Sequence, residues 1–172
     1  HDGLIAGYGL DYLDVSILNS SATVTRDPLI ISGAARGVPS NTDGGYDVEP
    51  ALVTVDVHLH NDAGVGGQYV VQVYFTPPVS PSRLTRYRYM LGGFAKVHID
   101  AHADAKATVK VMQRDLAHWV PSTDSESNGH TVDPGEYTLF VCHDSRGLGG
   151  DQGQAEGIKA EDGKCQSHAL TI

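Results

Sequence analysis

Histidine is the residue type that most strongly suggests chemistry in this sequence, because nine of its 172 residues are histidines. His58 and His60 lie two residues apart in an alternating segment. They would therefore share one face of a strand, at a spacing that could chelate zinc. No cysteine or carboxylate completes a zinc motif beside them, and the acidic residues in the glycine-rich stretches lack EF-hand spacing. We therefore expect a solvated histidine pair, with no metal and no cofactor.

Carboxylates and serines show no pattern of a hydrolase. The 21 acidic residues are scattered over expected turns and solvent-facing strand positions. A serine hydrolase would need a Gly-x-Ser-x-Gly elbow, and the sequence contains none. We predict no catalytic residue in this chain.

The two cysteines, Cys142 and Cys165, are 23 positions apart. Cys142 ends an expected strand, and Cys165 comes shortly before the last one. Antiparallel neighbours would bring the two within bridging distance, and a disulfide closing such a loop contributes roughly 3 kcal/mol on the chain-entropy model. Two unpaired thiols, one of them buried, are the alternative. The sequon Asn19-Ser20-Ser21 predicts N-glycosylation at Asn19 and fits a secreted, extracellular protein.

The segment 83–90 has the most unusual local composition, because arginine and tyrosine alternate in it. Such residues are enriched at interface cores. A docking or ligand-contact surface is one interpretation, and a charged edge strand that resists aggregation is the other. The candidate contact residues are Arg83, Arg86, Tyr87, Arg88 and Tyr89. Strand alternation would place Arg86 and Arg88 on one face and the two tyrosines on the other.

Short strands must position all of these residues, because the apolar residues alternate with period two and no helix of normal length is visible. In the clearest segment, Val53, Val55, Val57 and Leu59 share one face. The continuous apolar segment 69–75 predicts a central strand with both faces covered. The other expected strands are 12–24, 29–32, 86–100 (broken by Gly92-Gly93), 106–112, 135–141 and 168–172. These predict an all-β, two-sheet sandwich with two long loops, at 33–50 and 147–164.

Length and composition narrow the class further. Apolar residues make up 40% and charged residues 19%, which suits a single globular domain over 1–172. The formal net charge of −9 makes nucleic acid an unfavourable partner. No stretch approaches the ~20 apolar residues that cross a bilayer, so we expect no membrane contact. The first residues lack a basic region followed by an apolar run, so no signal peptide is expected.

Five segments resemble, in order, the C-terminal domain of family 3 glycoside hydrolases. They are Gly7-Tyr8-Gly9-Leu10-Asp11-Tyr12; the valine-rich strand 53–57 with Asn61-Asp62-Ala63-Gly64 and Val70-Val71-Gln72-Val73-Tyr74; Leu91-Gly92-Gly93-Phe94-Ala95-Lys96-Val97; Arg114-Asp115-Leu116-Ala117-His118-Trp119; and Asp133-Pro134-Gly135-Glu136-Tyr137-Thr138. Each of these matches is weak alone, but five matches in the same order are improbable by chance.

The resemblance implies an immunoglobulin or fibronectin type III-like sandwich. It also implies a non-catalytic accessory role in a β-glucosidase-like or β-xylosidase-like parent, whose catalytic carboxylates lie on upstream domains. Retaining hydrolysis needs two carboxyl groups roughly 5–5.5 Å apart. The expected partners are the catalytic domains of the parent, with a polysaccharide or lignin as further candidates. A stand-alone plant-polymer or glycan-binding module is the alternative.

Three large aromatic residues in the matched segments are expected to be structural. Tyr137 would bury its ring and bond a loop carbonyl, as a tyrosine corner does. Phe94 and Trp119 lie beside expected turns and would close the open ends of the sandwich, so that their loss would cost ~3–5 kcal/mol.

Overall fold

The computed structural model of the chain describes residues 13–25, 51–78, 87–120, 129–144 and 165–172. The expected strand 29–32 and the two expected long loops, 33–50 and 147–164, lie outside these ranges. Within them nearly every element is a strand, and none of the described residues forms a helix long and apolar enough to cross a bilayer.

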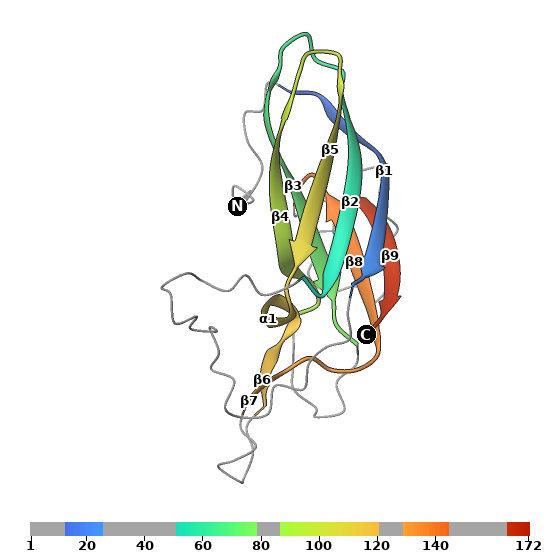
Figure 1. Ribbon diagram of the computed structural model, residues 1–172, viewed down its shortest axis with the longest axis vertical. Helices are drawn as coiled ribbons and strands as arrows, with labels where there is room; N and C mark the ends of the chain where they lie inside the picture. Colours follow the sequence, from blue (N-terminus) through green and yellow to red (C-terminus); the bar gives the residue numbers. More distant parts are fainter. Residues whose placement is uncertain (1–12, 26–50, 79–86, 121–128, 145–164) are drawn as a thin grey trace, which may run out of the picture.

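Two antiparallel sheets form the body of the molecule and face each other as layers (Figure 1). The first has the order β1-β2-β5, from β1 (Val15–Val24), β2 (Val53–Asn61) and β5 (Asp104–Val111). The second has the order β4-β3-β8-β9, from β4 (Met90–Ile99), β3 (Gly67–Thr76), β8 (Glu136–Cys142) and β9 (Cys165–Thr171). The predicted all-β, two-sheet sandwich is confirmed.

Three short elements lie beyond one end of the sheets (Figure 1). They are the single turn α1 (Gln113–Leu116) and a two-stranded ribbon of β6 (His118–Val120) and β7 (Gly129–Thr131). The side chains of Gln113 and Leu116 are buried, so α1 covers that end of the core. The sequence indicated only a turn here.

The core lies between the layers and follows the predicted alternation. Val53, Val55, Val57 and Leu59 of β2 have no solvent exposure, while Asp56 and His58 between them are exposed. The four buried side chains of β2 pack with the inward side chains of the facing sheet. Burying each such aliphatic side chain contributes ~1.5–3 kcal/mol.

Strand β4 differs from its prediction in two ways. It begins at Met90 rather than Arg86, and Gly92-Gly93 lie inside it instead of breaking it. The register with β3 shifts next to these glycines, between Val73 and Tyr74. A Cβ on Gly93 would lie 2.9 Å from the carbonyl oxygen of Lys110 on the opposite sheet. Glycine is required here because the two layers approach closely.

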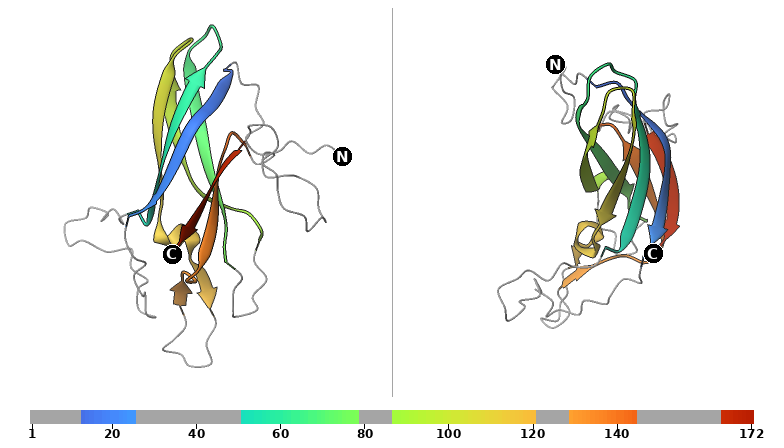
Figure 2. Two further views of the ribbon diagram at one scale, coloured as in Figure 1. Left: turned by 90° about the vertical axis from the view of Figure 1, so that its right-hand side faces the viewer. Right: turned by 45° about the horizontal axis from the view of Figure 1, so that its top comes forward.

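The two sheets meet along one edge, where β1 and β9 lie side by side (Figure 2). The buried hydroxyl of Ser20 donates to Oε1 of Gln166 at 2.5 Å and lies 2.8 Å from Nε2 of His168. The amide of Gln166 in turn donates to the carbonyl oxygen of Ile17 at 3.0 Å. Polar contacts therefore join the two layers at this edge, whereas apolar packing joins them elsewhere.

The entry to β8 confirms the predicted tyrosine corner. Gly135 has φ of 144°, and a Cβ there would lie 2.9 Å from Pro78, so the turn requires glycine. Two residues later, Tyr137 has no solvent exposure, and its hydroxyl donates to the carbonyl oxygen of Asp133.

The structural role predicted for Phe94 and Trp119 is wrong. Phe94 is 66% exposed and Trp119 is 52% exposed. Phe94 lies on the outward side of β4, and Trp119 lies on the ribbon beyond the sheets. Neither side chain is part of the core, so a loss of ~3–5 kcal/mol no longer follows for their removal.

Candidate docking surface

The predicted contact segment lies only partly within the described residues. Arg83 and Arg86 lie outside them, whereas Tyr87, Arg88 and Tyr89 immediately precede β4. Residues 87–89 are not part of a strand, so the strand alternation expected for them does not apply. Tyr87 is 82% exposed.

Tyr89 connects this segment to the second sheet. Its ring meets that of Phe140 on β8 edge to face, with centroids 5.6 Å apart. The guanidinium carbon of Arg88 lies 5.4 Å from the centroid of the Tyr89 ring, within the range of a cation–π interaction. The structure therefore places Arg88 and Tyr89 together instead of on opposite faces.

The predicted disulfide joins Cys142 to Cys165, with Cα atoms 4.4 Å apart. The two residues are register partners on β8 and β9, as expected for antiparallel neighbours. Both sulfurs lie on the outward side of the four-stranded sheet, beside Phe140, in a small cluster separate from the main core. The bridge thus supports the outer surface of one sheet and does not link the two layers.

Strand alternation explains why aromatic and aliphatic side chains gather on this outer surface. In β4, Ala95, Val97 and Ile99 pack toward the core, so Phe94 must point outward. In β3, Val71 and Val73 are fully buried, so Val70 and Tyr74 point outward. Tyr74 is paired with Leu91 of β4 on one side and with Phe140 of β8 on the other.

We call the resulting surface the outer aromatic face. Its exposed members are Phe94 at 66%, Leu91 at 50% and Val70 at 37%. Its partly or largely covered members are Tyr74, Tyr89 and Phe140, which pack around the disulfide. The sequence interpretation did not identify this surface as a site, although the alternation of β4 and the continuous apolar segment of β3 are the signals that reveal it.

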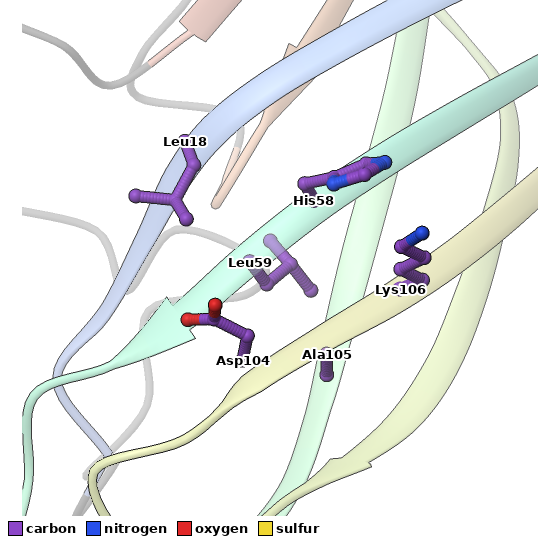
Figure 3. Close-up of a pocket in the computed structure, with 6 residues that line it drawn as sticks. All are labelled: Leu18, His58, Leu59, Asp104, Ala105 and Lys106. Carbon is purple, nitrogen blue, oxygen red and sulfur yellow. The ribbon is translucent and has the colours of Figure 1, made fainter.

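The outward side of the three-stranded sheet is different, because charged and polar residues cover it. A hollow of ≈ 200 Å³ lies there, lined by Leu18, His58, Leu59, Asp104, Ala105 and Lys106. Figure 3 shows how these six residues lie on β1, β2 and β5. Asp104 is the single carboxylate that lines the hollow.

The carboxylate of Asp104 is hydrogen-bonded to the neighbouring His60. Its Oδ1 lies 2.6 Å from Nδ1 of His60, and Asp62 lies 3.4 Å from the other ring nitrogen. The hydrogen bond to Asp104 raises the pKa of His60 above its usual value. His58 and His60 do share one face, as predicted. Among the described residues, however, no group of three or more potential metal-binding side chains occurs.

Asn19 of the predicted sequon lies on the same polar sheet. Its register partner is His58, and a register shift in β1 falls between Ile17 and Asn19. The side chain of Asn19 is exposed, while Ser20 points inward to the Gln166 contact. An exposed asparagine at this position is accessible for modification.

Two further histidines have perturbed titration because the protein buries them. Burial lowers the pKa of His143, which bonds the hydroxyl of Tyr69, although nearby Asp144 acts in the opposite direction. Burial likewise lowers the pKa of His168 at the Ser20 contact. Both groups lie at structural contacts, and neither is beside the outer aromatic face residues Leu91 and Phe94.

Comparison with known proteins identifies similar domains inside longer polypeptides. Residues 69–145 match the sequence profile of the fibronectin type III-like domain. The chain is 33% identical over 153 residues to the probable beta-glucosidase M of Emericella nidulans, a match that covers 86% of this chain and 18% of that protein. It is 32% identical over 113 residues to beta-glucosidase cel3A of Pyricularia oryzae, covering 66% of this chain and 15% of that protein.

Solved structures give the same result. The beta-D-glucoside glucohydrolase from Trichoderma reesei matches with a TM-score of 0.64 and 26% identity, over 96% of this chain and 19% of that one. The beta-glucosidase D2-BGL from Chaetomella raphigera matches with a TM-score of 0.65 at 22% identity, which supports the fold alone. The chain therefore spans less than a fifth of the length of these relatives.

Proposed function

This chain belongs to the fibronectin type III-like domains of family 3 β-glucosidases, and from that premise we propose that it is a non-catalytic accessory domain. In this role it packs against the catalytic domains of a β-glucosidase-like parent and stabilises them. The observation that carries the proposal is the extent of the match, because 86% of this chain corresponds to only 18% of a β-glucosidase.

The physical character of the domain supports this role. Its described residues form a hydrophobic core between two layers, as expected of a domain that folds as a unit of its own. The one carboxylate in the hollow of the three-stranded sheet is already bound to His60. We therefore assign bond cleavage in the parent to residues outside the described part of this chain.

An extracellular location is part of the proposal. The disulfide between Cys142 and Cys165 and the exposed Asn19 of the sequon suit an oxidising, secretory environment.

The parent protein provides the test. The full-length enzyme and a version lacking this chain would be compared by the half-life of aryl-glucosidase activity at raised temperature. We expect the truncated enzyme to lose activity several-fold faster, because an accessory domain that binds only the folded partner stabilises it by linkage. Equal half-lives would contradict the stabilising role. Release of p-nitrophenol from an aryl-glucoside by this chain alone would contradict its non-catalytic character.

A further inference from the structure

Strand β3 carries apolar side chains on both of its faces. Tyr69, Val71, Val73 and Phe75 fill the core side. The continuous apolar segment predicted a strand covered on both sides, but Val70 on the outward side remains 37% exposed. Among the described residues, no element covers this second face of the sheet.

The exposed apolar area extends from β3 to the neighbouring edge strand. Leu91 and Phe94 of β4 stand beside Tyr74 and Gln72 of β3 in the sheet register. Tyr74 continues the surface to Phe140 of β8. Apolar side chains from three strands thus adjoin one another, whereas single exposed apolar residues would need no explanation.

The charges on this side of the sheet lie at its ends. Lys96 and His98 follow Phe94 toward one end of β4, and Glu136 begins β8 at the other. Lys96 is the register partner of Val70, so one charge borders the outer aromatic face at that end, while the members of the face itself carry no charge. An interface core has the same composition, because charged residues are depleted there and aromatic residues are enriched.

The opposite side of the sandwich has the character of a solvent-facing surface. Asp56, His58, Lys106 and Lys110 are exposed on the three-stranded sheet. The exposed Asn19 lies on that sheet as well, and a glycan there would extend into water. A large partner therefore fits against the four-stranded sheet and not against the three-stranded one.

We propose that the outer aromatic face is the surface that packs against the catalytic domains of the parent polypeptide. This proposal rests on the proposed function and adds the face that makes the contact. The comparisons support this choice of partner, since the matched region is only 18–19% of longer relatives and most of each relative lies outside it. A partner in the same polypeptide has a high effective concentration, so a patch of modest size is sufficient for stable packing.

Tyr87 and Arg88 lie at the rim of this contact. Both are exposed and immediately precede β4, and Arg88 lies over the ring of Tyr89, a partly covered member of the outer aromatic face. The rim is thus polar while the centre is apolar, as in most protein interfaces.

A matched pair of leucines makes the proposal testable. Leu91 on the outer aromatic face is 50% exposed, and Leu18 on the three-stranded sheet is 56% exposed. The full-length parent enzyme would be prepared with Leu91→Asp, with Phe94→Asp and with Leu18→Asp as the control. Enzymatic deglycosylation of all samples would remove any effect of Leu18→Asp on modification at Asn19.

Differential scanning calorimetry would then report whether the domain unfolds together with its partner. We expect one cooperative transition for the wild type and for Leu18→Asp. Leu91→Asp and Phe94→Asp should separate an early transition of this domain from that of the catalytic domains. They should also shorten the half-life of activity at raised temperature several-fold, while Leu18→Asp leaves it unchanged.

Each other outcome would overturn the proposal. If Leu91→Asp and Phe94→Asp behave as Leu18→Asp does, while removal of the whole domain still shortens the half-life, another face makes the contact and the proposed function stands. If removal of the domain has no effect, the proposed function fails as well.

If Leu91→Asp abolishes retention on cellulose or xylan but leaves a single transition, the face binds polysaccharide instead. If Leu91→Asp converts a dimer to a monomer in sedimentation without producing a second calorimetric transition, the partner is a second copy of the protein.

Discussion

The hydroxyl of Tyr137 donates a hydrogen bond to the carbonyl oxygen of Asp133, 2.9 Å away, from a ring that is completely buried. This contact fixes the chain where it enters β8, the strand that lies between β3 and β9. A contact between two residues four positions apart therefore helps to position a strand that contributes to both the core and the outer aromatic face.

Tyr137→Phe should destabilise the chain by about 1–3 kcal/mol, because it leaves a buried carbonyl without this donor. Urea unfolding followed by circular dichroism measures the difference. Tyr87→Phe is the matched control, since Tyr87 is 82% exposed, and it should leave the unfolding midpoint unchanged. A neutral Tyr137→Phe would show that the bond contributes nothing to stability.

Replacing both Cys142 and Cys165 by alanine should reduce the free energy of unfolding by roughly 3 kcal/mol, because the unfolded chain gains the entropy of an open loop. Non-reducing mass spectrometry would first confirm the bridge in the wild type. If reduction of the wild type and the double substitution leave the urea midpoint unchanged, the prediction fails.

Lowering the pH from about 7.5 to about 5 should weaken the fold through His143 and His168. Their pKa values are lowered in the folded state by burial. Below an unfolded pKa of about 6.5, the unfolded chain therefore binds protons that the folded chain does not. Their contribution to stability is complete above that pH and is lost as the pH falls toward the folded pKa values.

Urea midpoints across this pH range provide the measurement. His168→Gln should flatten the decline, because it removes one of the two responsible groups. The partly exposed His60 acts in the opposite direction, since its pKa is raised by its hydrogen bond to Asp104. His60→Gln should therefore steepen the decline or leave it unaltered, and a flatter curve for this variant would refute the assignment.

Asn19 should carry an N-linked glycan when the protein is secreted from a eukaryotic host. Digestion with peptide N-glycosidase should lower the mass and convert Asn19 to aspartate. Ser21→Ala should abolish the modification because Ser21 supplies the sequon hydroxyl, whereas Ser20→Ala should not, because Ser20 is the middle residue of the sequon, where any residue except proline is accepted. An unmodified Asn19 in the wild type would disprove this prediction.

Phe94→Ala should cost the isolated chain less than about 1 kcal/mol, because a side chain that is 66% exposed buries little area. Phe75→Ala should cost about 3–5 kcal/mol, because Phe75 is fully buried in the core. Urea unfolding of the two variants tests the contrast. A large loss for Phe94→Ala would restore the core role that the sequence suggested.

The positions of most strands along the sequence were predictable, because alternation of apolar and polar residues is a local signal. The inward residues of β2 follow from it. The pairing of Cys142 with Cys165 was expected from neighbouring antiparallel strands, and the buried Tyr137 from the turn that precedes its strand. The position of Phe94 did not follow from its size. Its alternation with Ala95 and Val97 indicated the outward side, but a large aromatic residue beside two glycines was interpreted as core.

The outer aromatic face could not be read as one surface from the sequence, because its parts come from separate segments. Val70 and Tyr74 are on β3, Leu91 and Phe94 on β4, and Phe140 on β8. Only the register of three strands brings them together. The short elements α1, β6 and β7 were also missed, because three or four residues show no recognisable period.

The bridge between Cys142 and Cys165 has a consequence for the tolerance of this fold to change. It holds one end of β9 to β8, and the paired backbone bonds between Gly135 and Ile172 hold the other end. The last strand is thus fastened at both ends independently of the residues that separate the cysteines. Insertions, deletions or a proteolytic cut in that stretch would therefore leave β9 attached to β8 at the edge of the sheet.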